Sequence, residues 1–331
     1  MSSDFTLRGV MLRDASGIYP DRWDLDVRDG HLTQRRPSGD ARAGCLYLTP
    51  GFHDAHVHLL HEGLARTRCD FSGCRSLTEA LGRLGDYCRA VPEEITAIWG
   101  ERWDESLWPE RRGPSPEELD RIESRRPVVL RRICGHRAAL NSEALRVASA
   151  SLGPLDPGGQ LVEEQAWGLA KLWPPSPAER RDALLAAQET AFGLGITRVS
   201  EMGGTGALET YRALSRSGEL RLTVLLYLRP TQIEEALDLR EETRTSPSGL
   251  RLGGIKIFTD GSIGARTAAL RDPYADRRDE RGLLLMSDAD LRDCLRRCRE
   301  HELPVAIHAI GDRALDQVIG ELARLDGDVT L

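Results

Sequence analysis

The stretch PGFHDAHVH at residues 50–58 decides how the rest of the sequence is interpreted. Residues 52–57 form one of several short runs that we interpret as buried strands. Because alternate residues of a strand face the same side, His56 and His58 point together and Val57 points away. Two imidazoles at the carboxyl end of one strand can bind a single metal ion. The segment therefore predicts a metal site at a strand end.

The surroundings of this pair strengthen the prediction. Four of the eight histidines of the chain stand at positions 53, 56, 58 and 61, although an H-x-H pair alone also arises by chance. Asp54 is suited to accept a hydrogen bond from a ligand imidazole. The alternative interpretation is that Asp54 has only a structural role at a turn or strand edge. We interpret His53 and His61 as bystanders.

Further short apolar runs predict buried parallel strands separated by helices. Serines at 76, 115, 176 and 287 begin helix-capping patterns. From residue 195 most strands follow one another at about 30 residues, the length of one unit of a (β/α)8 barrel. The predicted strands after residue 58 are 95–99, 128–133, 196–199, 222–228, 255–258, 305–307 and 329–331.

The interval between residues 58 and 195 is far longer than one barrel unit. It predicts an insertion over about 60–180 with strands and helices of its own. We expect this lobe at the mouth of the barrel, because a loop that follows a barrel strand emerges there. On this count the chain holds strands one to five and the start of strand six, whereas a closed barrel needs eight. Either the sequence is truncated or the barrel is not complete.

The segment GGIKIFTDGS at residues 253–262 places Lys256 in the middle of an apolar strand. Burial of an unmodified ammonium is costly, so such a lysine pairs with an acid, loses its proton or is modified. A neutral lysine can add CO₂ to form a carbamate, an anionic ligand that can bridge two metal ions. The alternative is a Lys256 that pairs with Asp260 or another acid.

The segment PVAIHAIGDRA at residues 304–314 ends an apolar strand at His308, where barrel active sites lie. Asp312 is placed to cap the next helix, expected over 313–325. A lone histidine at a strand end is usually a satisfied core residue. Its combination with His56, His58 and Lys256, all at strand ends on one face, is much more specific.

Residues 1–49 lack a helical period and predict a small antiparallel β unit, with strands at 7–12, 23–27 and 46–48 and a hairpin turn at Asp29-Gly30. The net charge of −7 disfavours nucleic acid and anionic membranes as partners. No run of about 18 apolar residues and no secretory signal is present. Seven cysteines without a C-x-x-C pair predict reduced thiols in a cytoplasmic protein.

Several ordered segments resemble the YtcJ-like branch of the amidohydrolase superfamily. They are LTPGFHDAHVH at 48–58, GERWDE at 100–105, CGHRAALNSEAL at 134–145, GIT at 195–197, KIFTDGSIGARTAAL at 256–270 and the run 308–314. The resemblance implies the α/β fold of a TIM-type (β/α)8 barrel over 50–331. It also implies a small β-sandwich built from both chain ends, to which residues 1–49 contribute.

The same resemblance implies a metal-dependent hydrolase with one or two divalent ions, for which we expect zinc. His56 and His58 match the strand-one ligands, Lys256 the strand-four lysine that is often carboxylated, and His308 the strand-five ligand. Family members continue into a strand-six histidine and a strand-eight aspartate that takes the proton from the attacking water. Neither is present in these 331 residues, so the catalytic base is not assigned.

The expected reaction is hydrolysis of an amide-type C–N bond in a small molecule by a metal-activated water. Trp103 and His136 are expected to reach the substrate, with packing as their alternative. Arg266 is a further candidate, with an ion pair to Asp260 or Asp272 as its alternative. The full set of candidate substrate contacts and residues behind the ligands is Asp54, Trp103, His136, Glu201, Asp260, Arg266 and Asp312.

The rival interpretation is a truncated, inactive fragment that binds metal weakly or pairs with another chain. An open sheet edge at strands five and six favours association, including that of two copies.

Overall fold

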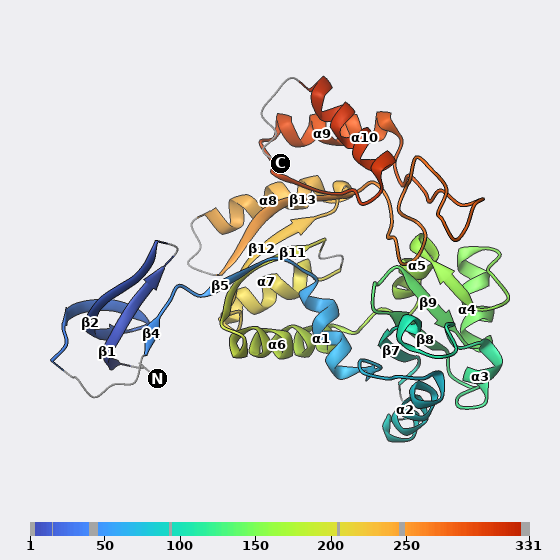
Figure 1. Ribbon diagram of the computed structural model, residues 1–331, viewed down its shortest axis with the longest axis horizontal. Helices are drawn as coiled ribbons and strands as arrows, with labels where there is room; N and C mark the ends of the chain where they lie inside the picture. Colours follow the sequence, from blue (N-terminus) through green and yellow to red (C-terminus); the bar gives the residue numbers. More distant parts are fainter. Residues whose placement is uncertain are drawn as a thin grey trace. The chain divides into compact units, whose positions relative to one another are not determined.

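The computed structural model describes residues 4–14, 16–39, 46–92, 95–203, 206–244 and 249–325. Contacts divide the chain into two compact units (Figure 1). One comprises residues 1–53 with 195–197, and the other comprises 54–194 with 198–331. The strand expected at 329–331 lies outside the described residues. No helix in the described ranges is long and apolar enough to cross a membrane.

The amino-terminal unit is built on a four-stranded sheet in the order β3-β2-β1-β4. Asp29 and Gly30 both have positive φ (48° and 75°), as a tight turn between antiparallel strands requires. The predicted hairpin is present, but its second strand, β3, is exposed along its whole length and has no apolar alternation to predict it. The strands are β1 (Phe5–Asp14), β2 (Gly17–Arg28), β3 (His31–Pro37) and β4 (Tyr47–Leu48).

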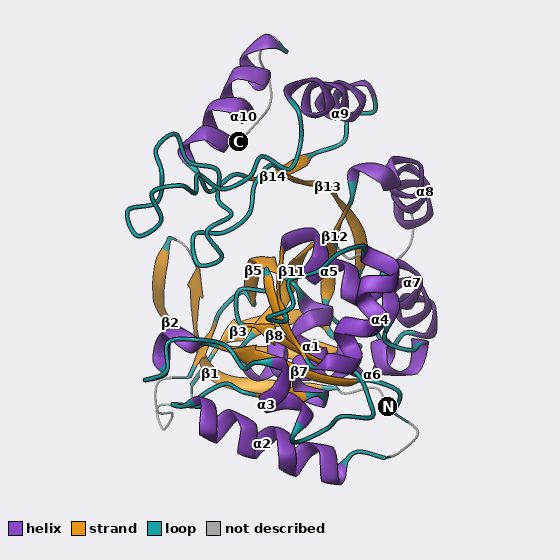
Figure 2. Ribbon diagram, turned by 90° about the vertical axis from the view of Figure 1, so that its right-hand side faces the viewer, coloured by secondary structure: helices purple, strands orange, loops and turns teal. Residues whose placement is uncertain are grey.

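A second sheet carries the strands expected of the barrel. Its order, β14-β13-β12-β11-β5, follows the chain in reverse, and β11, β12, β13 and β14 pair in parallel. Figure 2 shows α7, α8 and α9 following the outer side of these strands. The strands are β5 (Phe52–Val57), β11 (Ile196–Met202), β12 (Thr223–Leu228), β13 (Leu250–Phe258) and β14 (Val305–His308).

Burial alternates residue by residue along β12, as a strand with one face covered by helices requires. The strand β5, which was predicted to be buried, is instead largely exposed. Ile255 and Ile257 of β13 are fully buried, and β13 packs against α8 and α7. Lys256 stands between Ile255 and Ile257 in the sequence, so its side chain points to the face of the sheet opposite to theirs. The long step from β13 to β14 contains the loop 259–287 as well as a helix. The helices of this part are α1 (Leu59–Thr67), α6 (Pro177–Gly193), α7 (Leu208–Ser217), α8 (Ile233–Arg244), α9 (Asp288–Glu300) and α10 (Asp312–Arg324).

Residues 69–172 form a lobe with a five-stranded sheet in the order β10-β9-β8-β7-β6. The strand expected at 95–99 runs instead as β7, Ile98–Trp103, and β6, β9 and β10 were not predicted because they are only two to four residues long. The elements of the lobe are β6 (Cys69–Asp70), α2 (Leu77–Ala90), β7 (Ile98–Trp103), η1 (Glu105–Leu107), α3 (Pro116–Asp120), β8 (Val128–Arg132), β9 (Arg137–Leu140), α4 (Ser142–Leu152), β10 (Gln160–Val162) and α5 (Glu163–Leu172).

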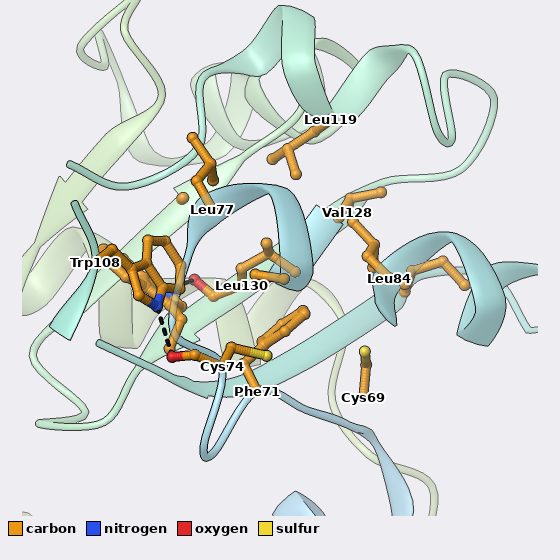
Figure 3. Packing of buried hydrophobic residues seen from close by; sticks show 13 residues of the cluster. Cys69, Phe71, Cys74, Leu77, Leu84, Trp108, Leu119, Val128 and Leu130 are labelled. Atoms are coloured by element: carbon orange, nitrogen blue, oxygen red, sulfur yellow. Dashed lines mark hydrogen bonds between the residues drawn. The ribbon is translucent and has the colours of Figure 1, made fainter. Parts of the chain in front are cut away.

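Both faces of the lobe's sheet are buried. Ile98 and Val128 belong to one apolar cluster and their neighbours Trp99 and Val129 to another on the opposite face. Figure 3 shows the first cluster, in which the indole of Trp108 donates to the carbonyl of Cys74 (2.9 Å). A sheet buried on both faces gives continuous apolar runs in the sequence.

The predicted helix starts are confirmed. Ser76, Ser115, Ser176 and Ser287 each accept a hydrogen bond from the backbone of the first helical turn. The helix expected at 313–325 is α10, which starts one residue earlier, at Asp312, with Gly311 in the capping position. The six described cysteines are free thiols.

Candidate active site

The first element of the candidate site is the junction of β5 and α1. His56 lies in β5, and His58 is the residue that precedes α1. Their rings are 5.7 Å apart, edge to face. Burial lowers the pKa of His58 to about 4, with a further contribution from the neighbouring charges of His56 and Lys256. Burial also lowers the pKa of His56. Both imidazoles are therefore neutral at pH 7, which is the form that binds metal ions.

The same junction is fixed from behind by Glu201, a buried residue of β11. Its carboxylate accepts the backbone N–H of Leu59 (2.5 Å) and the hydroxyl of Tyr211 (3.1 Å). Burial raises the pKa of Glu201 to about 7. An acid at the amino end of a helix satisfies backbone donors that have no partner within the helix. Glu201 thus positions the start of α1, directly after His58.

Lys256 is 2% exposed and makes no ion pair in the described part of the chain. Its ammonium lies 4.9 Å from the ring centroid of Phe258, two residues along the same strand. Burial, together with a smaller contribution from the charge of Arg229, lowers the pKa of Lys256 to about 8. A deprotonated amine is thus accessible near neutral pH.

The alternative pairing of Lys256 with Asp260 does not form. Asp260 is fully buried, and its two oxygens accept the backbone N–H groups of Ala269 (2.9 Å), Ile310 (2.9 Å) and Gly311 (2.7 Å). These bonds tie the loop after β13 to the turn after β14. Asp260 therefore acts as a structural anchor of the two loops that carry the site.

His308 ends β14 directly beside the end of β13, because Phe258 and His308 are partners in the register of the two strands. The two rings stack at 5.2 Å. Nε2 of His308 lies 2.8 Å from the carbonyl oxygen of Gly261 and 3.7 Å from Oδ1 of Asp260. Burial lowers the pKa of His308.

A fourth histidine joins this group from the lobe. The ring of His136 lies 5.9 Å from that of His308 and 5.3 Å from that of Trp167. Trp167 in turn lies 6.1 Å from Phe258. The lobe therefore brings His136 to the carboxyl ends of β13 and β14.

Trp103, which was expected to reach the substrate, packs in the core of the lobe instead. It is fully buried in the core of the lobe, 6.0 Å from Trp108, and its indole donates to the carbonyl of Leu130 (3.2 Å). A side chain without exposed surface cannot contact a substrate, so Trp103 is a core residue.

Arg266 forms an ion pair with Asp276, not with Asp260 or Asp272. It lines a cavity of about 360 Å³ between the lobe and the loop after β13, together with Arg132, Arg111 and Tyr274. Its backbone has φ of +59°, a left-handed conformation that is uncommon for a residue with a Cβ.

Asp54 has a local hydrogen-bond partner, whereas Asp312 binds the backbone of the loop that follows β13. Asp54 accepts the backbone N–H of His56 (3.1 Å), which is the turn-type alternative. Asp312 is the first residue of α10 and not its cap, because Gly311 occupies the capping position. The carboxylate of Asp312 accepts the backbone N–H of Arg271 (2.8 Å).

Among the described residues, no three His, Cys, Asp or Glu side chains lie close enough together to hold one metal ion. The four-residue ligand set therefore stays a prediction. The chemistry of the donors still fits a divalent ion, because two neutral imidazoles adjoin a buried amine that has no counter-ion. In carbamate form Lys256 would add the anionic oxygen donors that this group lacks.

Two residues at the site were not predicted. Glu163 binds His136, and Arg229 lies with its guanidinium 4.4 Å from the centroid of Phe258. Glu163 stands beside Glu164 in the sequence, 27 positions from His136, so no local spacing singles it out. For Arg229 the signal was its position directly after the predicted strand 222–228.

A family model for the amidohydrolase family matches residues 43–329, so the chain belongs to that family. The chain is 31% identical over 298 residues to the putative amidohydrolase YtcJ of Bacillus subtilis (strain 168). The aligned region covers 84% of this chain and 55% of that protein. The chain is 29% identical over 316 residues to Protein LONG AFTER FAR-RED 3 of Arabidopsis thaliana, covering 85% and 53%. The chain thus spans about half the length of these curated relatives.

Two solved structures share the fold of the chain. An uncharacterized metal-dependent hydrolase from Pyrococcus horikoshii OT3 is 28% identical, with a TM-score of 0.72 over 98% of this chain and 68% of that one. Another from Pyrococcus furiosus is 27% identical, with a TM-score of 0.69 over 96% and 70%.

Proposed function

We propose that this protein is a metal-dependent hydrolase that cleaves an amide-type C–N bond in a small molecule through a metal-activated water. The proposed ligands are His56, His58, Lys256 as its carbamate, and His308. The observation that carries the proposal is Lys256, a buried amine that has no counter-ion among the described residues and lies near neutral imidazoles. Membership of the amidohydrolase family supports the reaction class.

The proposed metal is zinc, which accepts nitrogen and oxygen donors of this kind. When bound, such an ion lowers the pKa of a coordinated water to about 7 and polarises a carbonyl group. The chain's own residues supply the frame. Glu201 fixes the turn after His58, and Asp260 ties together the loops that follow Lys256 and His308.

The carbamate is a direct test, because the chain has only two lysines, Lys171 and Lys256. The protein would be equilibrated with zinc and ¹³C-bicarbonate, and its ¹³C NMR spectrum recorded together with its zinc content. We expect one carbamate signal that disappears in Lys256→Ala and persists in the matched control Lys171→Ala. A zinc-loaded chain without that signal would exclude the role given to Lys256.

A further inference from the structure

Glu163 is a buried carboxylate that the proposed reaction has not used. It is the first residue of α5 and is 3% exposed. Its φ of +47° is left-handed, a conformation that is strained for a residue with a Cβ. The fold therefore holds this carboxylate in place at some cost in stability.

Both oxygens of Glu163 are engaged. Oε2 lies 2.8 Å from Nδ1 of His136, and Oε1 accepts the hydroxyl of Thr267. The backbone N–H of Glu163 also donates to the carbonyl of His136 (2.9 Å). Because a carboxylate only accepts hydrogen bonds, Nδ1 of His136 carries the proton. In the neutral ring Nε2 is then left with a lone pair.

The held imidazole stands at the mouth of the candidate site. His136 lies 5.9 Å from His308, ring to ring, and its side chain is 13% exposed. A small molecule that reaches His308 can therefore also reach His136.

Gly261 shows how closely this group is fitted to the candidate ligands. A Cβ at Gly261 would lie 2.2 Å from Oγ1 of Thr267 and 2.5 Å from Oε1 of Glu163. The carbonyl of Gly261 is also the group 2.8 Å from Nε2 of His308. Gly261 therefore packs against the Glu163–Thr267 hydrogen bond and contacts His308 as well, which is possible because it has no side chain.

We propose that Glu163, supported by Thr267, is a positioning residue that holds His136 in its Nδ1–H form, so that Nε2 accepts a hydrogen bond from the substrate. This inference rests on the proposed function, because it takes the substrate to be an amide. An acceptor at this position fits amides that carry an N–H group. It offers nothing to an ester or an N-alkylated amide.

The orientation of His136 is tested first, without metal or substrate, by ¹⁵N NMR of the histidine side chains. Signals lost in His136→Phe identify the ring. The wild-type chain and the matched control Glu164→Ala, which changes an exposed neighbour, are expected to show the Nδ1–H tautomer. Glu163→Ala is expected to shift it to Nε2–H. An Nε2–H tautomer in the wild type would overturn the proposal even if Glu163→Ala does not fold.

The role toward substrate is tested with 4-nitroacetanilide and its N-methyl analogue on the zinc-loaded chain. For His136→Phe we expect KM to rise about tenfold for the N–H amide, the cost of one hydrogen bond, and little for the N-methyl amide. Equal losses on both substrates would refute the acceptor role. Failure of the wild type to hydrolyse either amide would contradict the proposed function, while the tautomer still decides the role of Glu163.

Discussion

Two aromatic rings in this chain each carry two cations, and they differ in what balances the charge. In the lobe, Arg68 and Arg131 lie over Trp99, with ring distances of 4.4 and 5.5 Å, and Glu101 is 2.8 Å from both. In the barrel sheet, Arg229 and Lys256 lie over Phe258 at 4.4 and 4.9 Å.

The difference lies in the partner. Glu101 contacts both cations in the lobe and offsets one of their two charges, whereas Lys256 has no ion pair within the described residues. Buried cations that share a carboxylate in this way need no ligand to hold them. A buried cation without such a carboxylate is typical of a functional site, because another charged species can complete it.

The largest expected effect is in the lobe. Among the described residues, Glu101 is the only carboxylate that contacts both Arg68 and Arg131, and Glu101→Gln leaves these two buried cations without it. Loss of one partner of a buried ion pair costs about 3–5 kcal/mol. We expect the free energy of unfolding, measured with urea, to fall by that amount. The control is Asp86→Asn at the exposed pair with Arg89, which should change it by less than about 0.5 kcal/mol; equal effects would contradict the comparison.

Removal of a cation beside Phe258 is expected to change the free energy of unfolding in the opposite direction. Lys256→Met replaces a buried charge that has no partner with an apolar side chain of similar length. The metal-free chain should become more stable by about 1–2 kcal/mol, while zinc binding is lost. Lys171→Met, at the surface, should leave both unchanged. A destabilised Lys256→Met variant would show that Lys256 already has a stabilising partner.

The smallest expected effect depends on pH. Glu118 pairs with Arg112 through both oxygens (2.7 Å each) and caps α3. The Arg112 hydrogen bonds are the largest cause of a Glu118 pKa of about 2. Because this pKa is lower in the folded state, the stabilisation exists above about pH 4.5 and is lost as pH falls toward 2.

Glu118→Gln should therefore be less stable than the wild type by about 1 kcal/mol at pH 7, since the pair is partly exposed. The deficit should shrink progressively in urea titrations below pH 4.5. A deficit that stays constant down to pH 3 would show that the charge of Glu118 contributes nothing.

Long regular features of the fold could be predicted from the sequence. The parallel strands of the barrel sheet are apolar runs between well-marked helix caps, and Ser115 and Ser176 sit in complete capping boxes. The short strands β6 and β10 could not be predicted, because two or three residues carry no period. The exposed strand β3 has no buried face to produce alternation.

Within the site, burial of Lys256 followed from the apolar residues on both sides of it, and His308 followed from its position at a strand end. Partners far apart in the sequence did not follow. Nothing local shows that Asp260 binds backbone groups 9 to 51 positions away. The same holds for Trp103, whose full burial depends on the packing of the lobe around Trp108.

The proposed metal site is tested most directly by a crystal structure of the zinc-loaded chain with an anomalous difference map at the zinc edge. We predict a zinc peak bound by His56 and His58, with a carboxylated Lys256 and His308 completing the site. Zinc bound by other residues, or an unmodified Lys256 paired with a carboxylate in the zinc-loaded chain, would contradict this prediction.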